Sequence, residues 1–258
     1  NTPIVFCGAN FFDTRRLVDQ KLFTGISEEI DIKGTLDVAL QQRPNTRQIV
    51  VVNDTSVTGQ LAHNQFTEIV AQYPQLKFVF LEDVTMDEIR QQVSKLGPDS
   101  LVLLTLFFRD KAGAFFEYDA FTTLISQSSV VPVYGSWDFS LGYGIVGGKL
   151  TSGYTEGQRA AQLAQRILQG ASPQSIPVVK QVESRYMFDY KQLQRFNINL
   201  ADLPPDSVVI DRPVSFYESY KTLIWVVGIG IALLLLVAVA SDLIVVRRAQ
   251  PVFNEFKM

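Results

Sequence analysis

Residues 222–241, TLIWVVGIGIALLLLVAVAS, contain no charged side chain. A helix of about 20 apolar residues crosses a bilayer core that is about 30 Å thick. Beyond Asp242 the apolar zone continues through 243–246, so a spanning helix over 222–246 has room to tilt. A buried core helix is a poorer interpretation, because core helices of this length keep a polar face. A signal peptide is excluded, because the segment lies near the C-terminal end. The sequence therefore predicts one transmembrane helix.

The charges beside this helix predict its orientation. Arg247 and Arg248 follow the apolar zone directly, whereas Lys221 and Arg212 on the other flank are accompanied by acidic residues. Cytoplasmic flanks carry the excess of lysine and arginine. We therefore expect residues 247–258 to be a cytoplasmic tail. Residues 216–221 would form a juxtamembrane segment, and the large domain before them would lie outside the cytoplasm.

Before the membrane helix, apolar strands alternate with amphipathic helices. The expected strands are 3–8, 48–52, 77–81, 101–106 and 130–134, and the expected helices are 35–42, 59–72, 85–96 and 115–127. Strands that are apolar on both faces indicate a parallel sheet covered by helices. The predicted fold class is therefore α/β, followed by one transmembrane helix.

Ligands of such sheets bind outside the carboxyl ends of the strands. The segments at these ends are rich in aromatic and polar side chains, as a small-molecule site requires. The candidate ligand-binding residues are Asn53, Asp54, Thr55, Phe107, Phe108, Arg109, Tyr134, Ser136, Trp137 and Asp138, with Asn10 after the first strand. Arg109 could pair with a carboxylate, and Phe107, Phe108 and Trp137 could stack on a ring. Ordinary loops with helix caps are the alternative interpretation.

Several kinds of chemistry have no support in the sequence. His63 is the one histidine and lies beside Asn64 and Gln65, so a solvated or hydrogen-bonded side chain is expected, and no catalytic triad can be argued from it. Cys7 is the one cysteine and is expected to be a small buried side chain. No metal-ligand spacing is present, and no catalytic residue or cofactor is predicted. The net charge of −3 gives no support for nucleic-acid binding. We therefore expect no enzymatic activity in this chain.

The sequence pattern of residues 153–178, GYTEGQRAAQLAQRILQGASPQSIPV, points more specifically to one protein family. This pattern resembles the late helix and strand of type I periplasmic binding proteins of the ABC-transporter substrate-binding family. Residues 190–210 look like the tail of the same family. Residues 212–221, which lead into the membrane helix, are similar to membrane-anchored versions. Those versions are the extracytoplasmic sensors of bacterial histidine kinases and diguanylate cyclases.

The resemblance implies two α/β lobes with a ligand in the cleft between them. Residues 25–148 would form one complete lobe, and residues 1–24 and 149–215 would form part of the first lobe. Family members have further strands before the first one here and continue into signalling domains. The resemblance therefore implies a chain that is truncated at both ends, whose large domain is periplasmic and whose single helix spans the bacterial inner membrane.

Two functions follow from the resemblance. The first is a sensing module of a two-component or cyclase receptor, which binds a small molecule and passes the signal through the membrane helix, with a homodimer in the full-length receptor. The alternative is a membrane-tethered solute-binding protein of an ABC transporter. The C-terminal position of the helix favours the sensor, because tethered binding proteins are usually anchored at their N-terminus. An envelope protein with an empty cleft is a third interpretation. The sequence does not identify the ligand.

Overall fold

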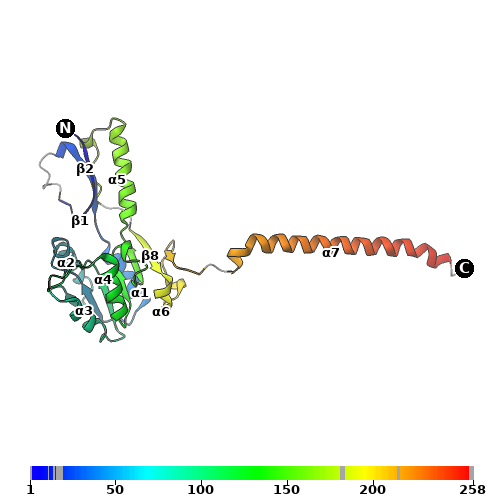
Figure 1. The fold of residues 1–258 in the computed structure, drawn as a ribbon, viewed down its shortest axis with the longest axis horizontal. Helices are drawn as coiled ribbons and strands as arrows, with labels where there is room; N and C mark the ends of the chain where they lie inside the picture. The colour runs from blue at the N-terminus through cyan, green and yellow to red at the C-terminus, as the bar shows by residue number, and fades with distance from the viewer. Residues whose placement is uncertain are drawn as a thin grey trace. The chain divides into compact units, whose positions relative to one another are not determined.

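The computed structural model describes residues 2–10, 12–13, 15, 20–180, 184–213 and 216–255. By its contacts the chain forms two compact units, Asn1–Arg212 and Pro213–Met258. The first unit contains sheets and helices, and the second contains one long helix (Figure 1). The mainly parallel sheet of the first unit confirms the predicted α/β fold class.

A sheet of seven strands forms the larger lobe of the first unit, in the order β4-β3-β5-β6-β7-β8-β9. Its strands are β3 (Gln48–Val52), β4 (Lys77–Leu81), β5 (Ser100–Leu104), β6 (Val133–Gly135), β7 (Gly147–Leu150), β8 (Arg185–Asp189) and β9 (Val208–Ile210). Neighbouring strands from β4 to β7 are parallel, β7 and β8 are antiparallel, and β8 and β9 are parallel.

Helices cover both faces of this sheet. They are α1 (Ile32–Gln42), α2 (Val57–Val70), α3 (Met86–Val93), α4 (Tyr118–Ser128) and α6 (Tyr190–Arg195). The described residues also contain short 3₁₀ helices, namely η2 (Gln20–Leu22), η3 (Asp138–Ser140), η4 (Pro173–Ser175) and η5 (Leu200–Asp202), of which η2 and η4 lie beside each other at the smaller lobe. Side chains alternate between the faces of a strand. Ile49 and Val51 therefore pack in one buried cluster with α1 and α2, and Val50 and Val52 in another with α3 and α4.

Local signals fix where these helices begin. The Thr85 side chain accepts a hydrogen bond from the backbone N–H of Glu88, and the Glu88 carboxylate accepts one from the N–H of Thr85 at 2.7 Å. This reciprocal pair satisfies two N–H groups that the first turn of α3 leaves without partners. This arrangement is a capping box, and it starts the helix expected over 85–96.

Strands β8 and β9 differ from the expected division of the chain. The family resemblance implies that residues 149–215 belong to the first lobe, but the strand pairing joins β8 and β9 to the sheet of the larger lobe. The free edge of β7 is completed by β8, and Gly147 permits this close approach. A Cβ atom at Gly147 would lie 2.1 Å from the backbone oxygen of Met187.

The smaller lobe is built from β1 (Ile4–Asn10), β2 (Phe23–Glu28) and α5 (Gly153–Leu168). Strands β1 and β2 pair in parallel, and Figure 1 shows α5 alongside them. Ile26 packs with Ala160 and Leu163 of α5 and with Ile176. Ile26 also forms a parallel bridge with Val179, so β2 has partners on both of its edges.

Two expectations for β1 were wrong. The strand was predicted to be buried, but its residues are exposed or half-buried, and Ile4 keeps 45% of its surface. Cys7 was predicted to be buried and is exposed. The physical reason is that, within the described residues, β1 pairs with a strand on one edge, so an apolar sequence has too few neighbours to cover it.

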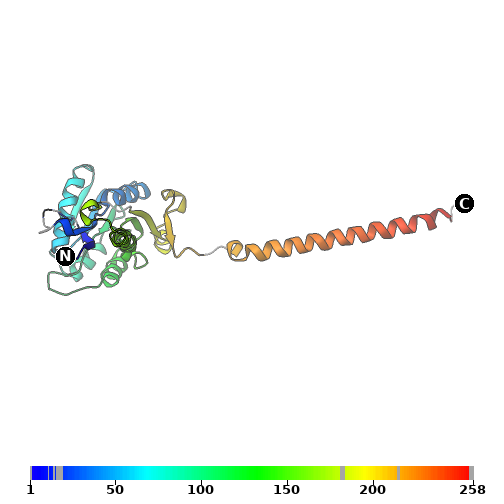
Figure 2. The ribbon, with the colours of Figure 1, turned by 90° about the horizontal axis from the view of Figure 1, so that it is seen from above.

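The second unit contains α7 (Phe216–Glu255), one continuous helix (Figure 2). Within it, Ser219–Ser241 has a mean hydropathy of 2.9 and none of it is buried against the rest of the chain. Among the described residues it is the one helix that is long and apolar enough to cross a bilayer. The predicted helix over 222–246 lies within α7, and the candidate membrane span covers it over 222–241.

Candidate functional site

Asn53 follows β3 and anchors the carboxyl edge of the larger sheet. Its side chain donates to the Gly59 carbonyl at 2.8 Å and to the Glu82 carboxylate at 3.0 Å, and it accepts from the Thr105 hydroxyl at 2.8 Å. It is 1% exposed. A buried amide with three satisfied hydrogen bonds holds neighbouring loops together. The Asn53 side chain therefore serves the fold at this edge.

Asp54 joins two of the predicted loops. Its carboxylate accepts the Phe108 backbone N–H at 2.8 Å and the Ser56 N–H at 3.0 Å, and the Ser56 hydroxyl also donates to it. Asp54 is 2% exposed. The next residue, Thr55, is exposed. The loops after β3 and β5 thus meet, as the parallel-sheet rule predicts.

A row of aromatic rings connects the loop after β5 with the loop after β6. The Phe108 ring lies 5.0 Å from that of Tyr118, and the Tyr118 ring lies 4.1 Å from that of Phe139. Phe139 stacks on Trp137 at 5.8 Å between ring centroids, with 18° between the ring planes. Tyr118 is 43% exposed, so this row has an accessible face. An apolar wall of this kind suits a flat or aromatic ligand.

Trp137 also connects the larger lobe to the smaller one. Its indole N–H donates to the Glu28 carboxylate at the end of β2. Asn10 at the end of β1 is the register partner of Glu28, so their backbones are neighbours across the small sheet. The site therefore includes strand ends of both lobes.

Glu156 in the first turn of α5 completes this cluster, and it was not among the predicted residues. It is 2% exposed and forms a hydrogen bond with Glu28. Two carboxyl groups can share a hydrogen bond when one of them keeps its proton. Burial, then the charge of Glu28 and the hydrogen bond to it, raise the pKa of Glu156 to about 7 from an ordinary 4.5, against the lowering effect of the Gly8 N–H. Asp138 contributes a smaller increase.

Gly8 is shaped for its contact with Glu156. The ladder between β1 and β2 shifts register between Phe6 and Ala9, and Gly8 inside this bulge has a φ of 68°. A bulge residue in the left-handed region favours glycine. Its N–H group is thereby available to the Glu156 carboxylate.

The remaining predicted residues have different surroundings. Phe107 is fully buried and packs on Phe116, and Arg109 is exposed. Tyr134 is 1% exposed, and its hydroxyl donates to the Gln42 carboxamide at 2.7 Å, beside the amino end of β3. Burial raises the pKa of Tyr134. Ser136 is 1% exposed, and its hydroxyl has no hydrogen-bond partner among the described residues.

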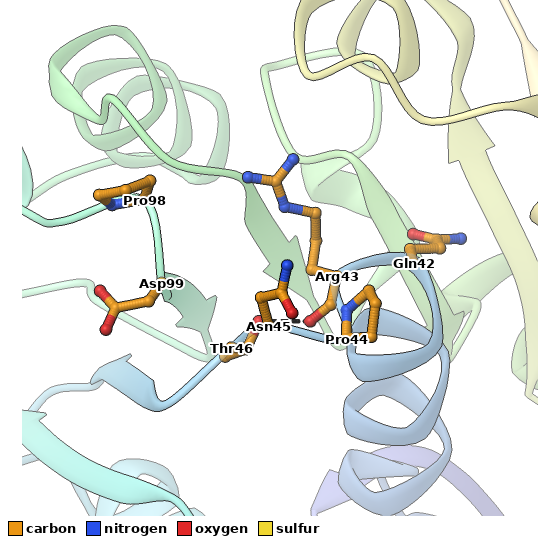
Figure 3. A pocket seen from close by; sticks show the side chains of 7 residues that line it. All are labelled: Gln42, Arg43, Pro44, Asn45, Thr46, Pro98 and Asp99. Atoms are coloured by element: carbon orange, nitrogen blue, oxygen red, sulfur yellow. Dashed lines mark hydrogen bonds between the residues drawn. The ribbon is translucent and has the colours of Figure 1, made fainter.

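The larger lobe also has cavities at both ends of its strands. One of about 370 Å³ lies at the amino ends of β3 and β5 and is lined by Gln42, Arg43, Pro44, Asn45, Thr46, Pro98 and Asp99 (Figure 3). Another of about 280 Å³ adjoins the carboxyl ends of β3 and β4 and is lined by Asp54, Thr55, Gln60, His63, Asn64 and Glu82. The ring nitrogen Nδ1 of His63 lies 2.7 Å from the Glu82 carboxylate, which confirms the expected hydrogen-bonded histidine.

A comparison with protein-family models agrees with the resemblance to substrate-binding proteins. A family model described as ABC transporter substrate binding protein matches residues 1–204. The chain belongs to this family. The ABC transporter substrate binding family consists of solute-binding proteins, so the two lobes are those of a binding protein. Among curated proteins, no sequence match was found.

Solved structures of other proteins show the same fold. A ligand-free, open substrate binding protein with adhesive properties from Clostridium difficile is 16% identical, with a TM-score of 0.57 over 74% of this chain and 63% of that one. A conserved domain protein from Vibrio cholerae is also 16% identical, with a TM-score of 0.54 over 72% and 63%. An ABC domain in complex with L-Trp from Streptococcus pneumonia is 15% identical, with a TM-score of 0.59 over 81% and 73%. The chain thus spans less than two thirds of the first two proteins.

Proposed function

We propose that this chain is the extracytoplasmic small-molecule sensing module of a transmembrane signalling receptor. The ligand binds in the cleft between the smaller lobe, which is built from β1, β2 and α5, and the larger lobe. The aromatic row and the Glu28–Glu156 cluster line this cleft. The membrane helix α7 carries the signal, and the receptor acts as a homodimer.

The observation that carries the proposal is the meeting of both lobes at Trp137. Its ring belongs to the aromatic row of the larger lobe, while its N–H group is bound by Glu28 of the smaller lobe. A ligand that contacts both lobes binds one relative position of the lobes better than others, and so shifts that equilibrium. The similar Streptococcus protein is in complex with L-Trp, which makes amino acids the first ligands to test.

The alternative is a membrane-tethered solute-binding protein that delivers its ligand to an ABC transporter. The connection to α7 favours the sensor. Three residues separate Arg212, at the end of the first unit, from Phe216, the first residue of α7. So short a segment reaches about 12 Å at most when extended. A short connection suits a sensor whose domain acts on the helix, whereas delivery to a transporter gains from a longer, flexible tether.

Disulfide cross-linking of α7 separates the two functions. The full chain in nanodiscs would carry Cys7→Ser and Tyr220→Cys, which puts one cysteine at the start of the candidate membrane span. For a sensor, we expect saturating L-tryptophan, or the best binder among the amino acids, to change the rate of dimer cross-linking. A flexible insertion of about ten Gly and Ser residues after Pro213 should abolish that change while ligand affinity is kept. A rate that is the same with and without bound ligand argues for the tethered transporter component.

The proposed location is the bacterial inner membrane, crossed once, with the first unit in the periplasm. The exposed Cys7 provides a direct test, since the chain contains one cysteine. A membrane-impermeant maleimide should label Cys7 in intact spheroplasts. A variant with Cys7→Ser and Arg248→Cys should be labelled after permeabilisation alone. The reverse pattern would contradict the proposed orientation.

A further inference from the structure

We propose that the Glu28–Glu156 carboxyl pair is the subsite for a protonated amino group of the ligand. This inference rests on the proposed binding function and names the chemical class that the cleft selects. The groups that form the subsite are Glu28 on β2, Glu156 on α5, Asn10 on β1 and Asp138 after β6.

Hydrogen-bond acceptors outnumber donors at this place. Trp137 Nε1 donates to Glu28, and the backbone N–H of Gly8 lowers the pKa of Glu156. The oxygens Oε1 of Glu156 and Oδ1 of Asn10 are buried and have no partner among the described residues. The Glu156 side chain is 2% exposed, so bulk water does not solvate that oxygen. Buried acceptors without partners are costly and mark a position for a missing donor.

The missing donor is a cation. Glu28 and Asp138 are the charged groups that act on Glu156, and both raise its pKa, as expected of nearby negative charge. The ion pairs between described residues join no lysine or arginine to Glu28, Asp138 or Glu156. An ammonium group brings one positive charge and three N–H donors. It therefore matches two adjacent carboxyl groups and a neighbouring amide oxygen.

The neighbouring aromatic row indicates which kind of ligand body carries the amino group. Trp137 contacts the subsite through its N–H group and the aromatic row through its ring face. A ligand whose ammonium group reaches Glu156 thus has its apolar body beside Trp137 and Phe139. The expected class is a small amine with an apolar or aromatic body, to which L-amino acids belong.

Binding of such a ligand must release the proton that the carboxyl pair shares. Affinity for the amine should therefore increase as the pH rises towards about 7, by up to about tenfold per pH unit below that value, and should level off above it. The Gly8 N–H and the Trp137 N–H also face the pair but do not titrate in this range. An amine-free ligand should show no such increase.

Calorimetry on the full chain in nanodiscs with matched ligand pairs tests this inference. The pairs are L-phenylalanine with 3-phenylpropionate, L-tryptophan with indole-3-propionate, and L-leucine with 4-methylpentanoate. The variants are Glu156→Gln and Glu28→Gln, which keep the side-chain shape. Glu68→Gln on the exposed surface of α2 is the control with the same change of charge.

The expected result is that an amino acid binds the natural chain at least about tenfold more tightly than its amine-free partner, a difference of about 1.4 kcal/mol. Glu156→Gln and Glu28→Gln should each remove that preference and its pH dependence, and Glu68→Gln should change neither. Equal binding of both partners to the natural chain would overturn the subsite and leave the proposed function standing. Unchanged preference for the amino acid in both Gln variants would also overturn the subsite and leave the proposed function standing. Binding of neither partner in any pair would overturn both.

Discussion

Replacing Glu156 with Gln should stabilise the ligand-free first unit at neutral and alkaline pH. The natural carboxyl group must lose its proton in a buried position beside Glu28, and its pKa is raised from 4.5 to about 7 as a result. A change of that size corresponds to at most about 3 kcal/mol of unfolding free energy, because solvent screening and the coupling to Glu28 reduce it. The Gln side chain has nearly the same shape and carries no charge, so it avoids this cost.

The upward direction of the pKa change of Glu156 determines the pH range in which Glu156→Gln is stabilising. An acid with a raised pKa holds its proton more tightly in the folded than in the unfolded chain. The stability of the natural chain is therefore greatest below about pH 4.5 and is lost as the pH rises to about 7. The advantage of Glu156→Gln should be close to zero at the acidic end and should reach its full value above about pH 7.

Thermal unfolding of the full chain in nanodiscs, monitored by tryptophan fluorescence, measures the stabilisation by Glu156→Gln at each pH. The chain has two tryptophans, so Trp225→Phe leaves Trp137 as the reporter beside the substituted group. A gain of about 3 kcal/mol raises the Tm of a unit of this size by about 6–12 °C. Glu68→Gln should leave the Tm nearly unchanged. A Tm difference for Glu156→Gln that is below about 2 °C, or is the same at all pH values, would refute the reasoning.

Two further substitutions test the contacts that hold the site. Gly25→Ala would bring its Cβ to 2.2 Å from the backbone oxygen of Phe6, so it should weaken the β1–β2 pairing by about 2 kcal/mol or more and lower the Tm. Gly157→Ala in α5 has open space around it and should be neutral or stabilising by up to about 1 kcal/mol. Asn53→Ala should lower the Tm by about 4–8 °C, because it removes three buried hydrogen bonds, whereas the exposed Asn64→Ala should have little effect.

The sequence predicted the larger lobe well because its strands and helices alternate and its strands are apolar on both faces. That pattern has one common solution, a parallel sheet covered by helices, and it places the loops after β3, β5 and β6 at one edge. The contact between Asp54 and Phe108 follows from it. The pairing of β8 with β7 does not, because an antiparallel strand after a long connection carries no signal in the alternation.

Individual side chains were harder to predict than loops. The strand-end rule locates a backbone position and leaves the direction of the side chain open. Tyr134 lies within β6 and its hydroxyl bonds to Gln42, whereas Trp137 reaches the smaller lobe. Glu28 was missed although it ends a strand, because β2 is not among the strands that the alternating pattern predicts. Glu156 was missed because it lies in a helix, and its site exists only after α5 packs on β1 and β2.

The positions of Glu28 and Glu156 connect the stability that they cost the ligand-free chain with the proposed signal. Both acids belong to the smaller lobe, while Trp137 and Asp138 follow β6 of the larger lobe. In the ligand-free state a second carboxyl group beside the first is unfavourable, because one of them must keep a proton that neutral solution would remove. An ammonium ligand replaces this repulsion with attraction in the arrangement where the four side chains meet. Without ligand, the carboxyl pair destabilises the arrangement in which the four side chains meet, and a bound ammonium group stabilises that arrangement. The ligand therefore binds this arrangement of the two lobes better than others, and this difference in affinity shifts the conformational equilibrium.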